Sequence, residues 1–279
     1  MKLGFNEATT IGNSTLEQDL VLGEKLGYDY IEIRTMDKLP EYLKTHTVDD
    51  LANFFKTSKI KPLAFNTLYP VTFNDAAGEQ KIVDDLKYMI EVGNKIDCKV
   101  VIGVCNWDQG IKTKTEIKDE TVRMYQKLAD IAAPHGVKLC IEFCGAPVHT
   151  VNTFEQAMEI AEACNRDNVG VTLDCYHFHA MNSKMAALEA CDVNKVFIVH
   201  LDDAEDLPVG QGSDENRLWP GDGAVDLDGI LGTLAKKGYS NAISVELFRP
   251  EYYQLPAEEC LTIAKQKSEA VVSRHFTLG

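Results

Sequence analysis

The sequence lacks any long hydrophobic run. No stretch approaches the ~18 apolar residues of a membrane-spanning helix, and the opening segment MKLGFNEATT has no apolar core of the kind a secretory signal peptide needs. We therefore expect a cytoplasmic protein that makes no membrane contact. Basic residues are also few: 28 Lys and Arg stand against 43 Asp and Glu, which gives a formal net charge of −15. Since nucleic acid is bound by clustered Lys and Arg, this balance argues against a nucleic-acid partner and favours a small neutral or cationic substrate.

Two families of short motifs are missing as well. The eight cysteines form no Cys-x-x-Cys pair, and several lie inside apolar segments, so we interpret them as reduced and mostly buried thiols. No G-x-G-x-x-G or Walker motif occurs anywhere in the chain. A doubly wound open sheet normally carries such a glycine-rich phosphate turn after its first strand, so its absence makes that fold the second choice.

What the chain does contain is a regular alternation of short β-rich runs and longer segments of helical period. The predicted strands cover residues 2–8, 29–35, 62–68, 99–105, 138–144, 169–175, 195–201 and 242–248. The predicted helices cover residues 16–27, 49–58, 80–96, 120–136, 154–165, 227–238 and 257–273. Ser14-x-x-Glu17 is interpreted as the capping box of the first helix.

Eight such units predict an α/β fold of the (β/α)8 TIM-barrel type, which typically needs ~250 residues. The chain has 279 residues, and no low-complexity linker or charge block interrupts the series, so residues 1–279 are expected to form a single domain. In a barrel of this kind the active site lies at the carboxyl ends of the strands. That rule says where candidate functional residues should be sought.

Four residues of metal-ligand type stand late in the last four predicted strands: Glu142, Asp174, His200 and Glu246. They are 32, 26 and 46 residues apart, about one barrel unit each with a longer loop before the last. Glu246 also has the strand parity opposite to its aliphatic neighbours, so it faces away from them and must be solvated, paired or bound to a metal. The alternative is that each polar group is hydrogen-bonded separately by a neighbour. The late position of all four residues in consecutive strands favours one shared site.

Three carboxylates and one imidazole form a mostly hard donor set. Such a set suits Mn²⁺ or Mg²⁺ and is compatible with Co²⁺ or Zn²⁺, so we expect one divalent metal ion of open identity. A metal that polarises a carbonyl lowers the cost of removing the proton next to it, and Glu142 and Glu246 on either side could exchange that proton with the substrate. This is isomerase chemistry.

The same residues carry a resemblance to a known family. The chain resembles the xylose-isomerase-like TIM barrels and, among them, the bacterial inosose isomerases of inositol catabolism. The segments that carry this resemblance are FNEATT, GYDYIEIRTMDKLPEYLK, TVNTFEQA, NRDNVG, HLDDAEDLPVG, RLWPGDGAVDLDGI and SVELFRPEYY. The resemblance implies that Glu142, Asp174, His200 and Glu246 bind the metal and that Glu142 and Glu246 are the catalytic acid/base pair. It implies a keto-inositol substrate, a small polyol ketone whose carbonyl moves to the adjacent carbon.

Related ketose epimerases hold substrate oxygens with a histidine and an arginine, and the nearest counterparts in this chain are His177 and Arg217. Arg217 lies in a long loop that could cover the site. We also expect the amides Asn6 and Asn66, near the ends of early strands, to contact substrate hydroxyls. Glu32 either lines the same pocket or satisfies buried amides.

The chain departs from two relatives of this superfamily. The ketose epimerases carry another glutamate six residues after the one on the fifth strand, where this chain has Val148. Endonuclease IV needs additional histidines on earlier strands, where this chain offers Asn66 and residues 105–106. The open alternatives are a ketose epimerase or an inosose dehydratase on the same site, or a barrel that binds a metabolite without catalysis. The oligomeric state stays open, a homo-oligomer included.

Overall fold

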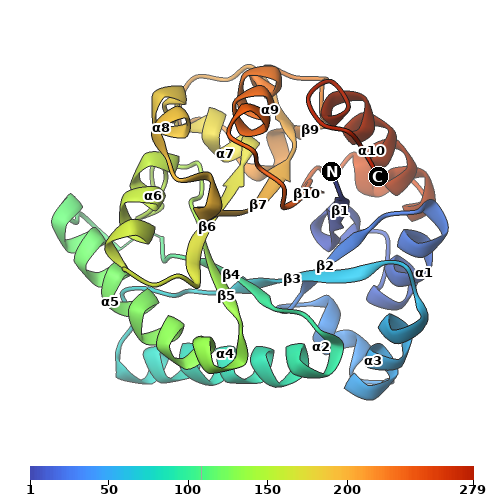
Figure 1. Ribbon diagram of the computed structural model, residues 1–279, viewed down its shortest axis with the longest axis horizontal. Coiled ribbons are helices and arrows are strands. Elements are labelled where there is room, and N and C mark those ends of the chain that lie inside the picture. Colours follow the sequence, from blue (N-terminus) through green and yellow to red (C-terminus); the bar gives the residue numbers. More distant parts are fainter. Residues whose placement is uncertain (108) are drawn as a thin grey trace.

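The structure is a computed structural model that describes residues 1–107 and 109–279. Across this described part, eight parallel strands close into a barrel in the order β1-β10-β7-β6-β5-β4-β3-β2, and helices surround them (Figure 1). The strands are β1 (Leu3–Asn6), β2 (Tyr30–Arg34), β3 (Lys61–Leu68), β4 (Val100–Val104), β5 (Lys138–Glu142), β6 (Val169–Asp174), β7 (Val196–Leu201) and β10 (Ala242–Val245). The predicted (β/α)8 barrel is confirmed.

The helices connect successive strands and form the outer layer of the molecule (Figure 1). They are α1 (Leu16–Leu26), α2 (Lys38–Tyr42), α3 (Val48–Thr57), α4 (Ala76–Ile96), α5 (Lys114–Ala132), α6 (Phe154–Ala163), α7 (Cys175–Ala180), α8 (Met185–Ala190), α9 (Leu227–Lys236) and α10 (Ala257–Val272). Short 3-10 turns occur at Glu7–Thr10 (η1), Ala133–His135 (η2), Val193–Lys195 (η3), Asp214–Asn216 (η4) and Tyr252–Gln254 (η5). Two short strands in the connection after β7, β8 (Asp203–Ala204) and β9 (Arg217–Leu218), form a separate antiparallel pair.

Strand parity divides the core into two regions. Outward residues such as Ile141, Leu173 and Val199 pack against the helices in the larger hydrophobic cluster. Inward residues such as Cys140 and Ile198 belong to a smaller cluster inside the barrel. Because side chains two positions apart share a face, the residues that follow this inner cluster on the same strands also point into the barrel, near its carboxyl-terminal rim.

The helix boundaries follow local signals. Helix α1 begins after Thr15, whose hydroxyl accepts a hydrogen bond from the Gln18 amide while the Gln18 side chain accepts one from the Thr15 amide. The predicted box at Ser14 and Glu17 was therefore wrong by one residue, because Thr15 and Gln18 have the same spacing and the right register. The helix ends at Gly27, which adopts a left-handed φ of 74° that glycine accepts without strain.

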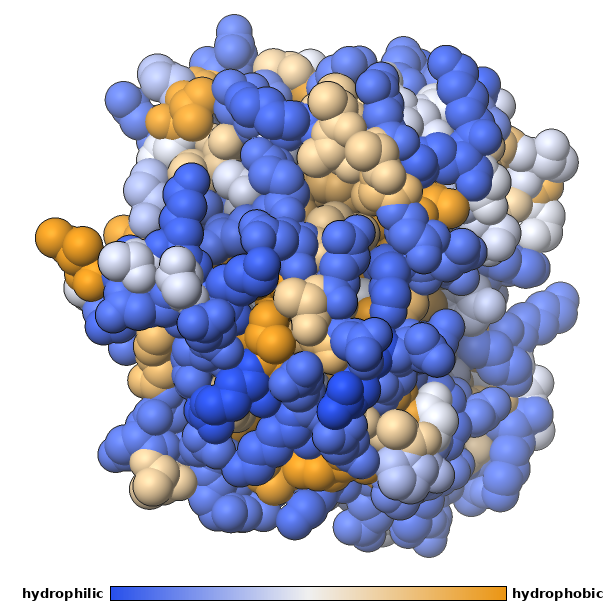
Figure 2. Space-filling view, turned by 60° about the vertical axis from the view of Figure 1, so that its left-hand side comes forward, coloured by the Kyte–Doolittle hydropathy of each residue, from blue (hydrophilic) through white to orange (hydrophobic). Residues whose placement is uncertain are grey.

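The surface shown in Figure 2 is mostly hydrophilic, and the described helices fall short of a membrane span in length or hydropathy. On the face shown in Figure 2, hydrophilic residues dominate and hydrophobic ones lie in small separate groups. Within residues 1–107 and 109–279, none of the helices is both long and apolar enough to span a bilayer. All eight cysteines are free thiols, and seven of them are buried, as their sequence setting predicted.

Candidate metal centre

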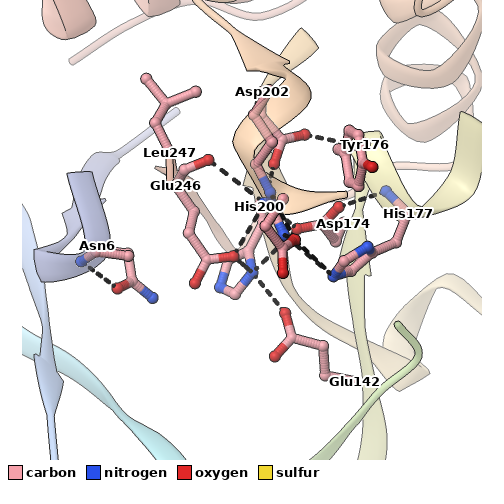
Figure 3. A network of polar contacts seen from close by, with 12 residues as sticks. Asn6, Glu142, Asp174, Tyr176, His177, His200, Asp202, Glu246 and Leu247 are labelled. Carbon is pink, nitrogen blue, oxygen red and sulfur yellow. Dashed lines mark hydrogen bonds and ion pairs between the residues drawn. The ribbon is translucent and has the colours of Figure 1, made fainter. Parts of the chain in front are cut away.

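Four barrel strands bring together the residues that the strand-end rule selected. Glu142 is the last residue of β5, Asp174 is the last of β6, His200 is the penultimate residue of β7, and Glu246 directly follows β10. One ligand atom from each of the four lies within 4.8 Å of all the others. Figure 3 shows their side chains converging from different strands onto one point. Their exposed fractions run from 0% to 5%, so the cluster is shielded from solvent.

The geometry around His200 fits a metal ion. Its Nδ1 atom is 2.8 Å from Glu142 Oε1, 3.1 Å from Glu246 Oε2 and 3.6 Å from Asp174 Oδ2. Despite this closeness, His200 Nδ1 and Glu142 Oε1 have no hydrogen-bond partner within the described part of the chain. Buried polar atoms are nearly always paired, and a divalent cation among four converging donors would satisfy both atoms. The residues present therefore fit one such ion.

The electrostatics of the cluster point the same way. Burial, together with the charges of Glu246 and Asp174, raises the pKa of the Glu142 carboxyl to about 7 although His200 opposes the shift. Burial lowers the pKa of His200, but the surrounding carboxylates, Glu246 first and then Glu32 and Glu142, outweigh it and raise that pKa well above its usual value. The site thus has an excess of negative charge that a divalent ion would balance.

Arg217, in β9, is buried with 1% of its surface exposed and is not a solvated loop charge. Its Nη1 atom donates to Asp174 Oδ2 at 2.7 Å and to Glu246 Oε2 at 3.1 Å, and it also contacts Asp202. Burial alone would raise the pKa of Asp174, but Arg217 and His177 hold it well below its usual range. The structure thus places the arginine against two carboxylates of the cluster.

His177 lies in the first turn of α7 and meets the other end of the same guanidinium. Its Nε2 atom is 3.1 Å from Arg217 Nη2. Because a guanidinium only donates, Nε2 must accept, so the proton of this neutral imidazole is on Nδ1. Burial lowers the pKa of His177, which agrees with a neutral ring. In the described residues Nδ1 has no partner, which leaves a buried donor beside the cluster.

The two predicted amides have different surroundings. Asn66 Nδ2 donates to Glu246 Oε1 at 3.3 Å, so this side chain touches the cluster directly. Asn6 Oδ1 accepts from the Ala8 amide at 2.9 Å and thereby caps η1, while its Nδ2 has no partner among the described residues. Asn6 is therefore at least partly structural (Figure 3).

Two further carboxylates lie at this site: Asp202, which the sequence prediction did not name, and Glu32, for which it left two roles open, lining the pocket or satisfying buried amides. Glu32 Oε2, on β2, lies 3.1 Å from His200 Nε2. Asp202 follows β7 and contacts Arg217, and its Oδ1 accepts from the Tyr176 amide at 2.6 Å. The position of Asp202, two residues after His200, could have signalled it because the two share strand parity. The pairing of Glu32 with His200 has no local signal, because the two residues lie on strands that are not neighbours.

Comparison with known proteins agrees with this geometry. The family model described as "Xylose isomerase-like TIM barrel" matches residues 21–268. Curated inosose isomerases from Halalkalibacterium halodurans and Bacillus subtilis are each 54% identical over 278 residues, which is 100% of this chain and 99% and 100% of theirs.

A solved structure agrees as well. The crystal structure of a protein called IOLI, with a bound zinc atom, superposes with a TM-score of 0.98 at 52% identity and covers 100% of both chains. Sequence match, overall architecture and the cluster at the strand ends all lead to one assignment. The chain belongs to the xylose isomerase-like TIM barrel family.

Proposed function

We propose that this protein is a metal-dependent inosose isomerase, which shifts the carbonyl of a keto-inositol to the adjacent ring carbon. The observation that carries the proposal is the buried cluster of three carboxylates and one imidazole at the rim of the barrel. The full-length identity of 54% to curated inosose isomerases supports the same substrate class. Under this proposal Glu142, Asp174, His200 and Glu246 hold one divalent ion, with Mn²⁺, Zn²⁺, Co²⁺ and Mg²⁺ as candidates.

The ion supplies Lewis-acid polarisation of the substrate carbonyl. Glu142 and Glu246 supply the proton chemistry. One carboxylate takes the proton from the hydroxyl-bearing carbon next to the carbonyl, which gives an enediol, and a proton is then returned to the former carbonyl carbon. The hydroxyl proton moves in the opposite sense, so the product is an isomer with no atom gained or lost.

Neighbouring side chains orient the ring. His177 Nδ1–H, which has no partner among the described residues, can donate to a hydroxyl oxygen of the substrate, and Arg217 and Asn66 offer further donors at the edge of the cluster. Asn6 Nδ2 is a fourth candidate. Fixing several hydroxyls at once favours a rigid ring over a linear chain, because less conformational freedom is lost on binding.

Three wider proposals accompany this function. The substrate is a small polyol ketone and not nucleic acid, which the net charge of −15 supports. The cytoplasm is the proposed compartment, and eight free thiols support a reducing environment. We also propose that residues 1–279 form one domain, which acts alone or as a homo-oligomer.

Proton NMR of the metal-loaded protein in deuterated water tests the reaction. With 2-keto-myo-inositol, we expect deuterium at the carbon that receives the proton and accumulation of a different keto-inositol. A diketone formed with loss of water would instead identify a dehydratase. Faster epimerisation of fructose or another linear ketose would replace the proposal with a ketose epimerase, and no turnover of any ketone would indicate a binding protein.

A further inference from the structure

Glu32 reaches the metal cluster from the far side of the barrel interior. It lies on β2, and β1 and β10 stand between that strand and β7, which carries His200. Glu32 Oε2 nevertheless lies 3.1 Å from His200 Nε2, and neither residue has any exposed surface. The contact therefore crosses the barrel and is isolated from water.

The two nitrogens of His200 face different groups. Nδ1 faces the cluster, 2.8 Å from Glu142 Oε1, whereas Nε2 faces Glu32. A nitrogen that binds a metal needs a free lone pair, so the single proton of a neutral imidazole must then lie on the other nitrogen. An acceptor beside Nε2 stabilises that arrangement, while a proton on Nδ1 would block the donor position.

In the described structure the Glu32 carboxylate has no hydrogen bond or ion pair other than its contact with His200. Its ion-pair partner there is His200 alone, and its second oxygen, Oε1, is buried without a hydrogen-bond partner. A buried carboxylate is costly unless it is paired, so the barrel interior keeps this group at an energetic cost. A role in packing does not account for it, because an apolar residue would fill the same space without that cost.

We propose that Glu32 is a positioning residue: by accepting a hydrogen bond from His200 Nε2–H it fixes the tautomer and the ring orientation of His200, so that Nδ1 faces the metal. This inference deepens the proposed function and rests on its metal site, but it does not depend on which ketone is turned over. Carboxylate partners of this kind are worth roughly a 10- to 100-fold change in metal affinity.

Zinc affinity provides the first test. Zn²⁺ is titrated into the metal-stripped full-length protein in competition with a chromophoric chelator. We expect Glu32→Ala to weaken zinc binding by roughly 10- to 100-fold, and Glu32→Gln, which keeps an acceptor oxygen, to weaken it less. Ser244→Ala is the matched control: Ser244 is buried in the same interior, pairs in register with His200, and its hydroxyl has no partner in the described residues. It should bind zinc as tightly as the wild type.

Imidazole ¹⁵N NMR provides a second readout that a general loss of packing would not reproduce. The chain has seven histidines, so the His200 signals can be assigned by their loss in His200→Ala. In the zinc-loaded wild type we expect His200 to have a protonated Nε2 and an unprotonated Nδ1. In Glu32→Ala we expect that His200 no longer shows this one tautomer alone.

Several results would overturn the inference. One is wild-type zinc affinity in Glu32→Ala, and another is an equal loss of affinity in Ser244→Ala. If Glu32→Ala fails to fold, the Gln variant and the wild-type tautomer still decide, since a proton on Nδ1 of the zinc-loaded protein contradicts the proposal. Failure here would leave the isomerase reaction standing, and failure of the substrate experiment would leave the role of Glu32 standing.

Discussion

Glu142 and Glu246 are both buried in the cluster, yet their surroundings differ. Glu246 is supported by Asn66, which donates to one oxygen, and by Arg217, which donates to the other. The short contact of Glu142 in the described structure is to His200 alone, and its Oε1 has no hydrogen bond there. The two carboxylates are therefore supported unequally, so the proposed acid/base pair is not symmetric.

The first prediction concerns this pair. Glu142→Gln and Glu246→Gln each keep one oxygen donor but lose the charge that accepts a proton. We expect kcat to fall by ~10² or more for either variant. Circular dichroism and bound-metal analysis serve as controls for folding and occupancy. Near-normal turnover by one variant would remove that residue from the acid/base pair, although it could still bind the metal.

Asp202 gives a second prediction at this scale. It is fully buried, accepts from the Tyr176 amide at 2.6 Å and contacts Arg217. Asp202→Ala removes an acceptor from both donors, and a hydrogen bond to a charged group is worth roughly 1.5–3 kcal/mol. We expect the free energy of unfolding to fall by about that amount in urea denaturation. Asp206→Ala, on an exposed side chain nearby, should change it by less than about 0.5 kcal/mol.

The sequence could predict the four cluster residues because each one lies within one residue of the carboxyl end of its strand. Parity and the barrel rule then put their side chains at one rim. Glu32 and Asp202 show where such reasoning ends. Glu32 meets His200 across the barrel, and that pairing depends on the tilt and stagger of strands that are not neighbours. The contact between Asp202 and Arg217 depends on how a long loop folds back.

At the scale of elements, the loop that carries Arg217 is fastened to the loop after β10. The Trp219 ring stacks on Tyr252, with ring centroids 3.9 Å apart and planes 13° apart. The Trp219 amide also donates to the Tyr252 hydroxyl at 3.3 Å. These contacts hold β9 beside the cluster, so they indirectly position the arginine.

The third prediction tests this anchor. Tyr252→Ala removes a stack worth about 0.5–1.5 kcal/mol. We expect the loop to loosen and KM for the ketone to rise. Hydrogen exchange of the amides in residues 213–222 should become faster. Tyr252→Phe keeps the stack and should stay close to the wild type in both measurements. Equal effects of the two substitutions would mean that the hydroxyl, and not the stack, holds the loop.

A charged link between two helices gives the fourth prediction. Glu79 on α4 accepts from Arg123 at 2.8 Å and from Lys127 at 2.6 Å, both on α5, and these hydrogen bonds lower the pKa of Glu79 to about 2. A lowered pKa stabilises the fold above the unfolded value, near 4.5, and the contribution is lost as the pH falls towards about 2. Glu79 is partly exposed, so we expect less than about 1 kcal/mol.

Urea denaturation of the wild type and Glu79→Gln measures this effect. The difference in the free energy of unfolding should be present at pH 6 and should shrink steadily below pH 4.5. A difference that stays constant down to the acid limit would show that the link does not act through the charge of Glu79.

Elements were predictable in proportion to their length. The seven helices of ten or more residues within the described ranges, such as α4 and α10, show a clear period and were predicted. Helices α2, α7 and α8 have only five or six residues, too few for a period to appear, and were missed. The pair β8–β9 has two residues in each strand, so no alternation could reveal it.

At the scale of the whole molecule, the metal site is one part of a strongly acidic protein. The chain carries a formal net charge of −15, so any divalent cation will be attracted to its surface as well as to the cluster. Surface binding is weak and shared among many carboxylates, whereas the four converging donors belong to one buried site. A measurement of metal-dependent stability must therefore separate binding at the buried cluster from binding at the acidic surface.

The last prediction uses that separation. An ion that binds only the folded protein stabilises it by about 2.7 kcal/mol when its free concentration is 100 times Kd. For a chain of 279 residues, this should raise Tm by roughly 4–6 °C, and excess chelator should reverse the rise. Asp174→Asn keeps the Oδ1 oxygen that accepts from the His177 amide at 2.6 Å but removes one charge from the cluster, so its metal-dependent shift should be much smaller. Differential scanning calorimetry of both proteins with Zn²⁺, Mn²⁺, Co²⁺ and Mg²⁺ makes the comparison, and the ion with the largest difference identifies the preferred metal. Equal shifts in the two proteins would mean that the ions act on the acidic surface, and the assignment of the cluster as the metal site would then be wrong.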